Sequence, residues 1–272
     1  MIGIIGQGFV GNAVYQSFKN HFDILTYDLD ESKCNSTFDE ISLKCKTIFV
    51  CLPTPMNGDG SCNVSIVEKV LLELNQRGLH NVVVKSTIPP GTTEKWNKRF
   101  SDLSIIFNPE FLTERNAVKD FENQSRIILG GPRPTTTEVK TIFSKVFPKA
   151  HIIKTDSTHA EMVKYLTNSF LATKVSFANE MYQICKGLGI DYDKVMEYSI
   201  QDERLGKTHW NVPGHDGDFG YGGHCLPKDV KALITAAVDL DILPEMLIAT
   251  DSKNNEVRKN RDWEKMKGRA VT

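Results

Sequence analysis

The 272-residue chain lacks the features that mark several specialised classes of protein. No apolar run approaches the roughly 20 residues that a membrane-spanning helix needs. The formal net charge is only −1, so there is no basic excess of the kind that binds nucleic acid or an anionic membrane. No repeat, low-complexity tract or Gly/Ser linker interrupts the sequence. The composition is that of an ordinary globular protein, and we expect neither a nucleic-acid partner nor a membrane partner.

The cysteines lack the spacings of zinc sites and of CxxC redox motifs. The six lie at positions 34, 45, 51, 62, 185 and 225. The chain is also much longer than the small secreted domains that depend on disulfides. Its first residues, Met1 to Ile5, resemble a core strand more than a removable signal. We therefore expect reduced thiols, a cytoplasmic location and no metal centre.

The first part of the chain alternates short apolar runs with amphipathic segments such as Val64–Asn75 and Thr135–Val146. The runs are Ile2–Ile5, Ile24–Tyr27, Thr47–Leu52, Val82–Lys85, Ser104–Phe107, Arg126–Leu129 and His151–Ile153. Strands that are apolar on both faces and alternate with helices predict a parallel sheet covered on both sides. The predicted fold class is α/β, with a Rossmann-like, doubly wound sheet in residues 1–155.

The pattern changes after residue 155. Residues 157–186 contain neither Pro nor Gly and predict one helix about 45 Å long. Ser157 or Thr158 is the candidate cap at its start, and Gly187 with Gly189 should end it. Further helices are expected at 192–200, 228–239 and 244–258, with a Gly-rich loop at 206–223. Residues 156–272 are thus predicted to form a mostly helical second domain built on the long helix.

A glycine motif follows the first predicted strand directly and predicts a dinucleotide site. It comprises Gly6, Gln7, Gly8, Phe9, Val10 and Gly11. The glycines allow a tight turn and a close approach of the backbone to a pyrophosphate at a helix N-terminus. Asp28 ends the second strand, where a carboxylate can bind a ribose and repel a 2′-phosphate. NAD is therefore favoured over NADP; a flavin- or nucleotide-binding fold is the alternative.

Two further turns should lie at the carboxyl ends of strands, where open α/β sheets bind ligands. One contains Pro53 and Thr54, and the other contains Ser86 and Thr87. Rigid turns that carry hydroxyl groups suit a cofactor or an ordered water molecule. The alternative is that their prolines only terminate the strands.

Cys225 is the candidate nucleophile of the second half. It follows Phe219, Gly220, Tyr221, Gly222, Gly223 and His224, and precedes Leu226, Pro227, Lys228 and Asp229. Pro227 should stand at the first helical position. A thiol at a helix N-terminus beside Lys228 should have a lowered pKa and more thiolate. The alternative is a small buried hydrophobic residue.

Two pairs of polar residues have helical spacing. Lys164 and Asn168 share one face of the long helix, where both side chains suit a cleft. The alternative is that the lysine side chain extends to the surface. Glu110 and Glu114 have the same spacing, and they could also be simple first-turn acids that suit a helix dipole.

Across about residues 1–260 the chain resembles the UDP-glucose 6-dehydrogenases and their sister nucleotide-sugar dehydrogenases, the UDP-glucose/GDP-mannose dehydrogenase family. The matching segments are GQGFVG (6–11), CLPTP (51–55), STIPPGTT (86–93), NPEFLTE (108–114), AEMVKYLTN (160–168), FANE (177–180) and GYGGHCLPKD (220–229). The order and separations of these segments match as well.

The resemblance implies an NAD-dependent, two-step oxidation of a nucleotide-sugar alcohol to a carboxylate, in polysaccharide biosynthesis, by a homodimer. It implies that Cys225 captures the aldehyde as a thiohemiacetal and then carries a thioester. Lys164 and Asn168 would stabilise oxyanions, and Asp229 and Thr87 would hold water. Glu114 would lie near the reacting centre, Glu110 would serve thioester hydrolysis, and Lys228 would lie near the cofactor or the thiolate. The implied substrate contacts are Phe111, Leu112, Lys164, Asn168 and residues 219–223, namely Phe219, Gly220, Tyr221, Gly222 and Gly223.

The chain departs from the family pattern in three places. Family members typically continue into a third domain that holds the nucleotide, and this chain stops at Thr272. His224 stands where a small side chain is usual, and the loop 213–218 is longer than in many members. These departures leave alternatives open: a single-step β-hydroxyacid dehydrogenase, a non-catalytic subunit that completes a separate nucleotide-sugar-binding partner, or a metal site at His209, His215, His224 and Cys225. The identity of the sugar and its nucleotide also stays open.

Overall fold

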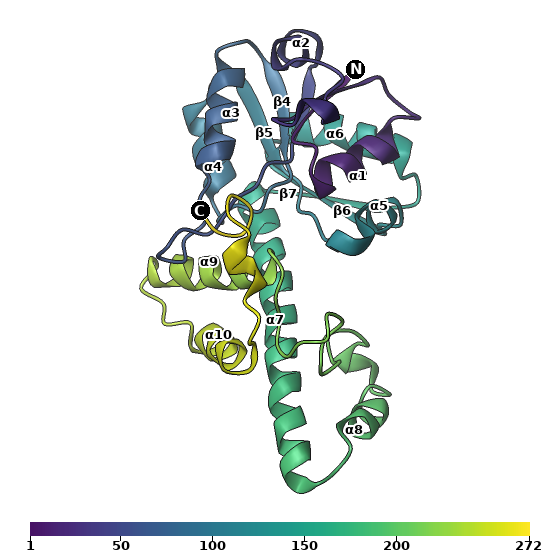
Figure 1. Cartoon of the computed structure of the whole chain (residues 1–272). Coiled ribbons are helices and arrows are strands. Elements are labelled where there is room, and N and C mark those ends of the chain that lie inside the picture. Colours follow the sequence, from purple (N-terminus) through teal and green to yellow (C-terminus); the bar gives the residue numbers. More distant parts are fainter. The chain divides into compact units, whose positions relative to one another are not determined.

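The computed structural model describes residues 1–272, which form two compact units (Figure 1). One unit contains Met1–Thr54 and Val64–Lys164, and the other contains Pro55–Asn63 and Tyr165–Thr272. The short segment 55–63 therefore belongs with the second half of the chain, although it follows a strand of the first unit. No helix of the chain is long and apolar enough to cross a membrane.

The first unit is built on a seven-stranded sheet of order β2-β1-β3-β4-β5-β6-β7. Its strands are β1 (Ile2–Ile5), β2 (Ile24–Tyr27), β3 (Thr47–Val50), β4 (His80–Val84), β5 (Leu103–Phe107), β6 (Arg126–Gly130) and β7 (His151–Thr155). The α/β class is confirmed. The expectation of an entirely parallel sheet is wrong at one place, because β5 and β6 meet in a single antiparallel pair, Phe107 with Gly130.

Helices cover both faces of this sheet (Figure 1). They are α1 (Phe9–Phe18), α2 (Phe38–Lys44), α3 (Ser65–Asn75), α4 (Thr92–Arg99), α5 (Ala117–Glu122) and α6 (Arg133–Val146). Successive strand residues point to opposite faces, so that Val82 and Val84 pack with α3 and α4 while Val83 packs with α1 and α6. The central strands β1, β3 and β4 are buried along their whole length, as expected for strands covered on both faces, whereas the edge strand β7 is largely exposed.

The second unit is organised around α7 (Ser157–Leu188), whose first residues belong to the first unit. The other helices are α8 (Tyr192–Ser199), α9 (Leu226–Val238) and α10 (Glu245–Val257). Hydrogen bonds join α7 to α10, from Ser176 to the Thr250 carbonyl at 2.8 Å and between Thr173 and Thr250 at 3.0 Å. Tyr192 of α8 packs in a separate cluster with Ala178 and Cys185 of α7.

Three expectations about helix ends need correction. The cap of α7 is Asp156, whose Oδ1 accepts a hydrogen bond from His159 N at 2.9 Å, and Ser157 is already helical. A charged acceptor before the first turn satisfies an N–H group that Ser157 or Thr158 was expected to cap. At the other end Gly187 is helical, and Gly189 alone adopts the left-handed conformation, with φ +70°. In α9 the first helical residue is Leu226, one position before Pro227.

Candidate active site

The glycine turn after β1 has the geometry of a phosphate-binding cradle. Gly6 has φ +92°, which glycine adopts readily. A Cβ atom on Gly11 would overlap the Gly6 carbonyl oxygen, whereas a Cβ on Gly8 would meet nothing within 4 Å. Helix α1 begins at Phe9, and Gly8 provides no side chain to cap it. Open space beside Gly8 at a helix N-terminus fits the pyrophosphate of a dinucleotide.

Asp28 lies directly after β2 and faces this turn. Its Oδ2 accepts a hydrogen bond from Gln7 N at 2.6 Å, and its Oδ1 accepts one from Asp30 N at 2.9 Å. The carboxylate is therefore fixed next to the glycine turn, although the two residues are far apart in sequence. Lys33, which follows on the same segment, pairs with Asp30 at 3.0 Å.

The two predicted turns on neighbouring strands are joined by hydrogen bonds. Ser86 Oγ accepts from Leu52 N at 3.0 Å and donates to the Leu52 carbonyl at 2.6 Å. Thr54 Oγ1 donates to the Thr87 carbonyl at 2.7 Å. These side chains thus hold both turns together at the carboxyl end of β3 and β4, as ligand-binding turns of this fold require.

Glu161, which the sequence reasoning missed, anchors the second of these turns. This side chain is fully buried, and its carboxylate accepts hydrogen bonds from Gly91 N at 2.5 Å and Thr93 N at 2.8 Å, at the start of α4. Burial raises its pKa, while the hydrogen bonds from Thr93 and Gly91 oppose that rise. The only available signal was an acidic residue three positions before Lys164.

Glu110 is held from two sides. Its Oε2 lies 2.8 Å from Lys85 Nζ, and its carbonyl oxygen accepts a hydrogen bond from Lys164 Nζ. Lys85 also donates to Asn108 Oδ1 at 2.7 Å. Lys164 is buried and does not reach the surface. The structure thus brings the predicted residues Glu110 and Lys164 into direct contact, and it adds Lys85, which the sequence did not single out, as the partner of the Glu110 carboxylate.

Glu110 and Glu114 do not share a helical face, so the prediction from their spacing is wrong. Residues 108–113 form an irregular loop, and Glu114 begins a short 3-10 helix, Glu114–Asn116. Pro109 cannot donate a backbone hydrogen bond and restricts the residue before it, which disfavours a helix at this point. Phe111 lies beneath two cations, Arg126 at 4.7 Å and Lys164 at 5.3 Å from its ring centre.

Leu112 and Glu114 have different surroundings. Leu112 packs against the apolar cluster of α1, α5 and α6. Glu114 lines a cavity of about 380 Å³ between the start of α1 and the start of α5, together with Phe9 and Asn12. This cavity therefore begins at the glycine motif.

In the second unit a buried polar array connects α7 to α9. Asn168 Nδ2 donates to Asp229 Oδ2 at 2.6 Å, and Lys228 Nζ donates to Asp229 Oδ1 at 2.6 Å. All three side chains are buried. Burial by itself would lower the pKa of Lys228. The negative charges of Asp229, Cys62 and Cys225 outweigh burial and raise the pKa above its ordinary value, so the lysine stays charged. The array is an ion pair with an amide that fixes its orientation.

Cys225 is the N-cap residue of α9 and is partly exposed. It lies near enough to Lys228 for the two groups to interact electrostatically. A thiol beside a buried ammonium group at a helix N-terminus has the environment of a reactive cysteine. Cys51 provides a contrast, because burial raises the pKa of its thiol to about 12.

The residues before Cys225 form an irregular loop. Phe219 packs against Tyr182 of α7, with 5.6 Å between the ring centres, and Tyr221 is buried beside Ala172 and Val230. Gly220 and Gly223 have φ of +68° and +72°. Their left-handed conformations explain why glycine recurs in this loop.

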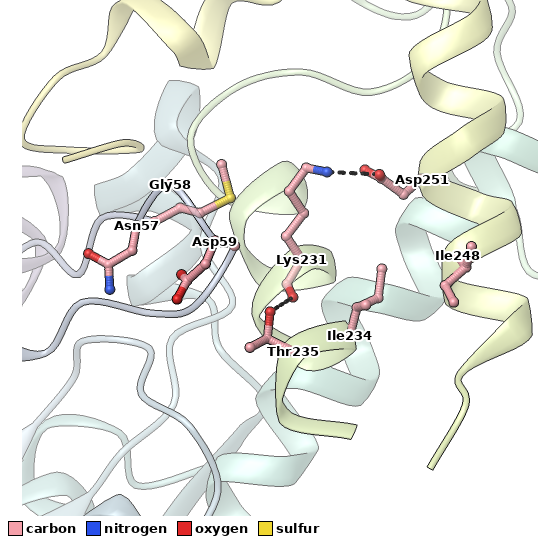
Figure 2. Close-up of a pocket in the computed structure, with 10 residues that line it drawn as sticks. Asn57, Gly58, Asp59, Lys231, Ile234, Thr235, Ile248 and Asp251 are labelled. Carbon is pink, nitrogen blue, oxygen red and sulfur yellow. Dashed lines mark hydrogen bonds and ion pairs between the residues drawn. The ribbon is translucent and has the colours of Figure 1, made fainter. Parts of the chain in front are cut away.

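A separate pocket of about 330 Å³ lies in the second unit between the segment 55–63, α9 and α10 (Figure 2). Lys231 and Asp251 form an ion pair of 2.8 Å in its wall. None of the predicted site residues lines it. No group of three or more His, Cys, Asp and Glu side chains is arranged to hold a metal ion.

Comparison with known proteins adds independent evidence. Residues 33–150 match the NAD binding domain of the UDP-glucose/GDP-mannose dehydrogenase family, and residues 158–256 match its central domain. The chain is 32% identical to UDP-glucose 6-dehydrogenase AglM of Haloferax volcanii over 93% of its own length and 69% of that protein. It is also 32% identical to UDP-glucose 6-dehydrogenase of Campylobacter jejuni, over 95% of its own length and 72% of that protein.

Among solved structures, a UDP-glucose dehydrogenase from the archaeon Pyrobaculum islandicum superimposes with a TM-score of 0.85. The two chains are 27% identical, and the match covers 94% of this chain and 68% of that one.

Proposed function

The chain belongs to the UDP-glucose/GDP-mannose dehydrogenase family of NAD-dependent enzymes, and we propose that it oxidises the C6 alcohol of a nucleotide sugar twice, yielding the carboxylate. UDP-glucose, which would become UDP-glucuronate, is the substrate that the relatives favour. The observation that carries this proposal is the buried array of Asn168, Lys228 and Asp229 beside Cys225. A single oxidation to an aldehyde or ketone needs no such thiol site.

We assign the cofactor contacts to the first unit. NAD⁺ supplies the hydride acceptor for each of the two oxidations. The glycine turn binds its pyrophosphate, and Asp28 binds the adenosine ribose. The rim of the cofactor site on the neighbouring strands consists of Pro53, Thr54, Ser86 and Thr87.

In the first oxidation the alcohol loses a proton and a hydride. Asp229 serves the proton transfer through a water molecule, and Asn168 stabilises the developing oxyanion. We also assign the stabilisation of negative charge to Lys164, which is buried. The product of this step is an aldehyde, which must be captured before it escapes.

The Cys225 thiolate then attacks the aldehyde carbon, and the carbonyl oxygen takes a proton to complete a thiohemiacetal. Loss of a second hydride and of the hydroxyl proton gives a thioester. Water attacks this thioester, the carbon–sulfur bond breaks, and the carboxylate and the thiolate are released. Glu110, held by Lys85, is the base that activates this water.

We also propose that the chain forms a homodimer through α7. Five apolar side chains of this helix are about half exposed or more: Leu166, Phe170, Phe177, Ile184 and Leu188. Phe170, Phe177 and Ile184 are seven residues apart and so share one face. A continuous apolar stripe of this length is rare on a monomer and suits a second copy of the same helix. Residues 156–272 would then act as a catalytic and dimerisation domain.

NADH formation from a panel of nucleotide sugars tests the proposal, with the sugar product identified by mass. We expect two NADH per sugar acid with UDP-glucose or a related nucleotide sugar. One NADH per sugar, unchanged in Cys225→Ser, would indicate a single-step dehydrogenase of the β-hydroxyacid type. No NADH with any sugar would indicate a subunit that depends on a partner.

A further inference from the structure

The loop that leads into Cys225 is held by side chains from other elements. Asn254 of α10 accepts a hydrogen bond from Tyr221 N at 2.7 Å and donates one to the Tyr221 carbonyl at 3.0 Å. Asn179 of α7 accepts from Gly220 N at 3.2 Å. A loop has no ladder or helix to satisfy its peptide groups, so these amides replace that pairing.

Arg258, at the end of α10, extends this support. Its side chain is only 1% exposed, and three carboxylates surround it. Its nitrogen atoms lie 2.7 Å from Asp216, 3.6 Å from Asp218 and 3.3 Å from Asp262. We refer to these four residues as the Arg258 cluster. Asp216 and Asp218 belong to the loop before Cys225, whereas Asp262 belongs to the segment that follows α10.

Asp262 connects the cluster to the peptide that stands two residues before the thiol. Both of its carboxylate oxygens accept from Gly223 N, at 3.2 and 3.1 Å. A Cβ atom on Gly222 would overlap the Arg258 guanidinium and Asp262, and one on Gly220 would overlap Asn254. The glycines therefore let these side chains approach the backbone closely.

We propose that Arg258 and Asp262 are positioning residues for Cys225. They neither touch the reacting carbon nor transfer a proton. Instead they fix the Gly222–Gly223 backbone, and this fixes the thiol at the first turn of α9. The segment after α10 is thus part of the support of the reactive site. The inference uses the proposed role of Cys225, but thiol reactivity can be measured without turnover.

The test compares Arg258→Met and Asp262→Ala with wild type in the full chain. Iodoacetamide labelling of the Cys225 peptide is followed by mass spectrometry between pH 6 and pH 10. We expect the midpoint of the labelling rate to move toward the ordinary thiol value of about 8.5 in both variants. The value of kcat should fall by roughly 10- to 100-fold, with a smaller change in KM.

Matched variants separate positioning from general stability. Arg261→Met removes a neighbouring, partly exposed arginine that pairs with Glu264 at 3.4 Å, and it should label like wild type. Asp262→Asn retains an acceptor for Gly223 N and should recover most of the activity. If Arg258→Met does not fold, Asp262→Ala still tests the positioning role. In that variant Arg258 keeps Asp216 and Asp218 as partners, so the buried charge is not left unpaired.

Two results have distinct meanings. A lower melting temperature with an unchanged labelling midpoint in Asp262→Ala would overturn the positioning role. A shifted midpoint with an unchanged kcat would support positioning and would contradict instead the catalytic role of Cys225.

Discussion

Lys85 Nζ lies 2.8 Å from Glu110 Oε2, and the lysine side chain is only 1% exposed. Lys85 directly follows β4, and its ammonium group also donates to Asn108 and lies 5.1 Å from the ring centre of Phe121. A buried ammonium group requires such a partner, because its desolvation is costly. The pair holds the carboxylate that we assign to thioester hydrolysis.

The variant Lys85→Met tests the importance of this pair. It leaves the Glu110 carboxylate without its cation, which should destabilise the fold by about 3 kcal/mol. Hydrolysis should slow by roughly 100-fold, because the base is no longer held. Urea denaturation measures the first effect, and the steady-state phase of NADH formation, which follows the burst of two NADH per chain, measures the second. Lys85→Met combined with Glu110→Gln should recover stability but not hydrolysis; wild-type hydrolysis in either variant would contradict the assignment.

Asp28→Asn tests the ribose contact. The amide oxygen can still accept from Gln7 N, but the charge that repels a 2′-phosphate is lost. We expect KM for NAD⁺ to rise by about 10-fold and the preference over NADP⁺ to fall. Asp30→Asn is the control, because Asp30 is exposed and caps the short helix Glu31–Lys33. Equal effects of both variants would argue against a contact specific to Asp28.

Phe170→Asp tests the dimer. A charge in the middle of the α7 stripe should shift the protein toward monomer in sedimentation velocity, without changing its circular dichroism spectrum. Leu240→Asp is the matched control, because Leu240 is also highly exposed but lies after α9, outside the stripe. A wild-type protein that sediments as a monomer at every concentration would exclude the dimer.

The Arg258 cluster predicts an acid-dependent loss of stability. Burial has the largest single effect on the pKa of Asp216 and raises it, but the Arg258 hydrogen bond, the hydrogen bond from Asp218 N and the Arg258 charge together outweigh burial and hold the pKa below 3.8. The stabilisation that ionised Asp216 contributes is therefore present above pH 3.8, and it is lost as the pH falls through the lower pKa that Asp216 has in the folded protein. Asp216→Asn should be less stable than wild type at pH 6, with the gap closing below pH 4. Urea denaturation at several pH values measures this gap, and a constant gap would contradict the prediction.

Periodicity and composition predicted the fold well, because the central strands β1, β3 and β4 are buried throughout and the helices that cover them have an apolar side. The ends of β1, β2 and α3 were predicted within one residue. The antiparallel contact of β6 could not be predicted, because an apolar run contains no information about its direction. Nothing in the composition of residues 55–63 indicated that they pack with the second half of the chain.

Candidate site residues could be predicted where a sequence motif lies at the end of a predicted strand or at the start of a predicted helix, as for the glycine turn and Cys225. Partners distant in sequence were missed. Lys85 follows an apolar run like any strand-ending cation, and Arg258 ends a predicted helix like any charged residue of a last turn. The sequence cannot show that both side chains are buried, because their partners come from other elements.

Trapping of the covalent intermediate is the sharpest test of whether Cys225 carries a thioester. Glu110→Gln, which should slow hydrolysis, is mixed with UDP-glucose and NAD⁺, quenched in acid and digested for mass spectrometry. We expect a nucleotide-sugar acyl group on the Cys225 peptide and two NADH per acylated chain. An unmodified Cys225 peptide, together with wild-type turnover in Cys225→Ser, would contradict this expectation.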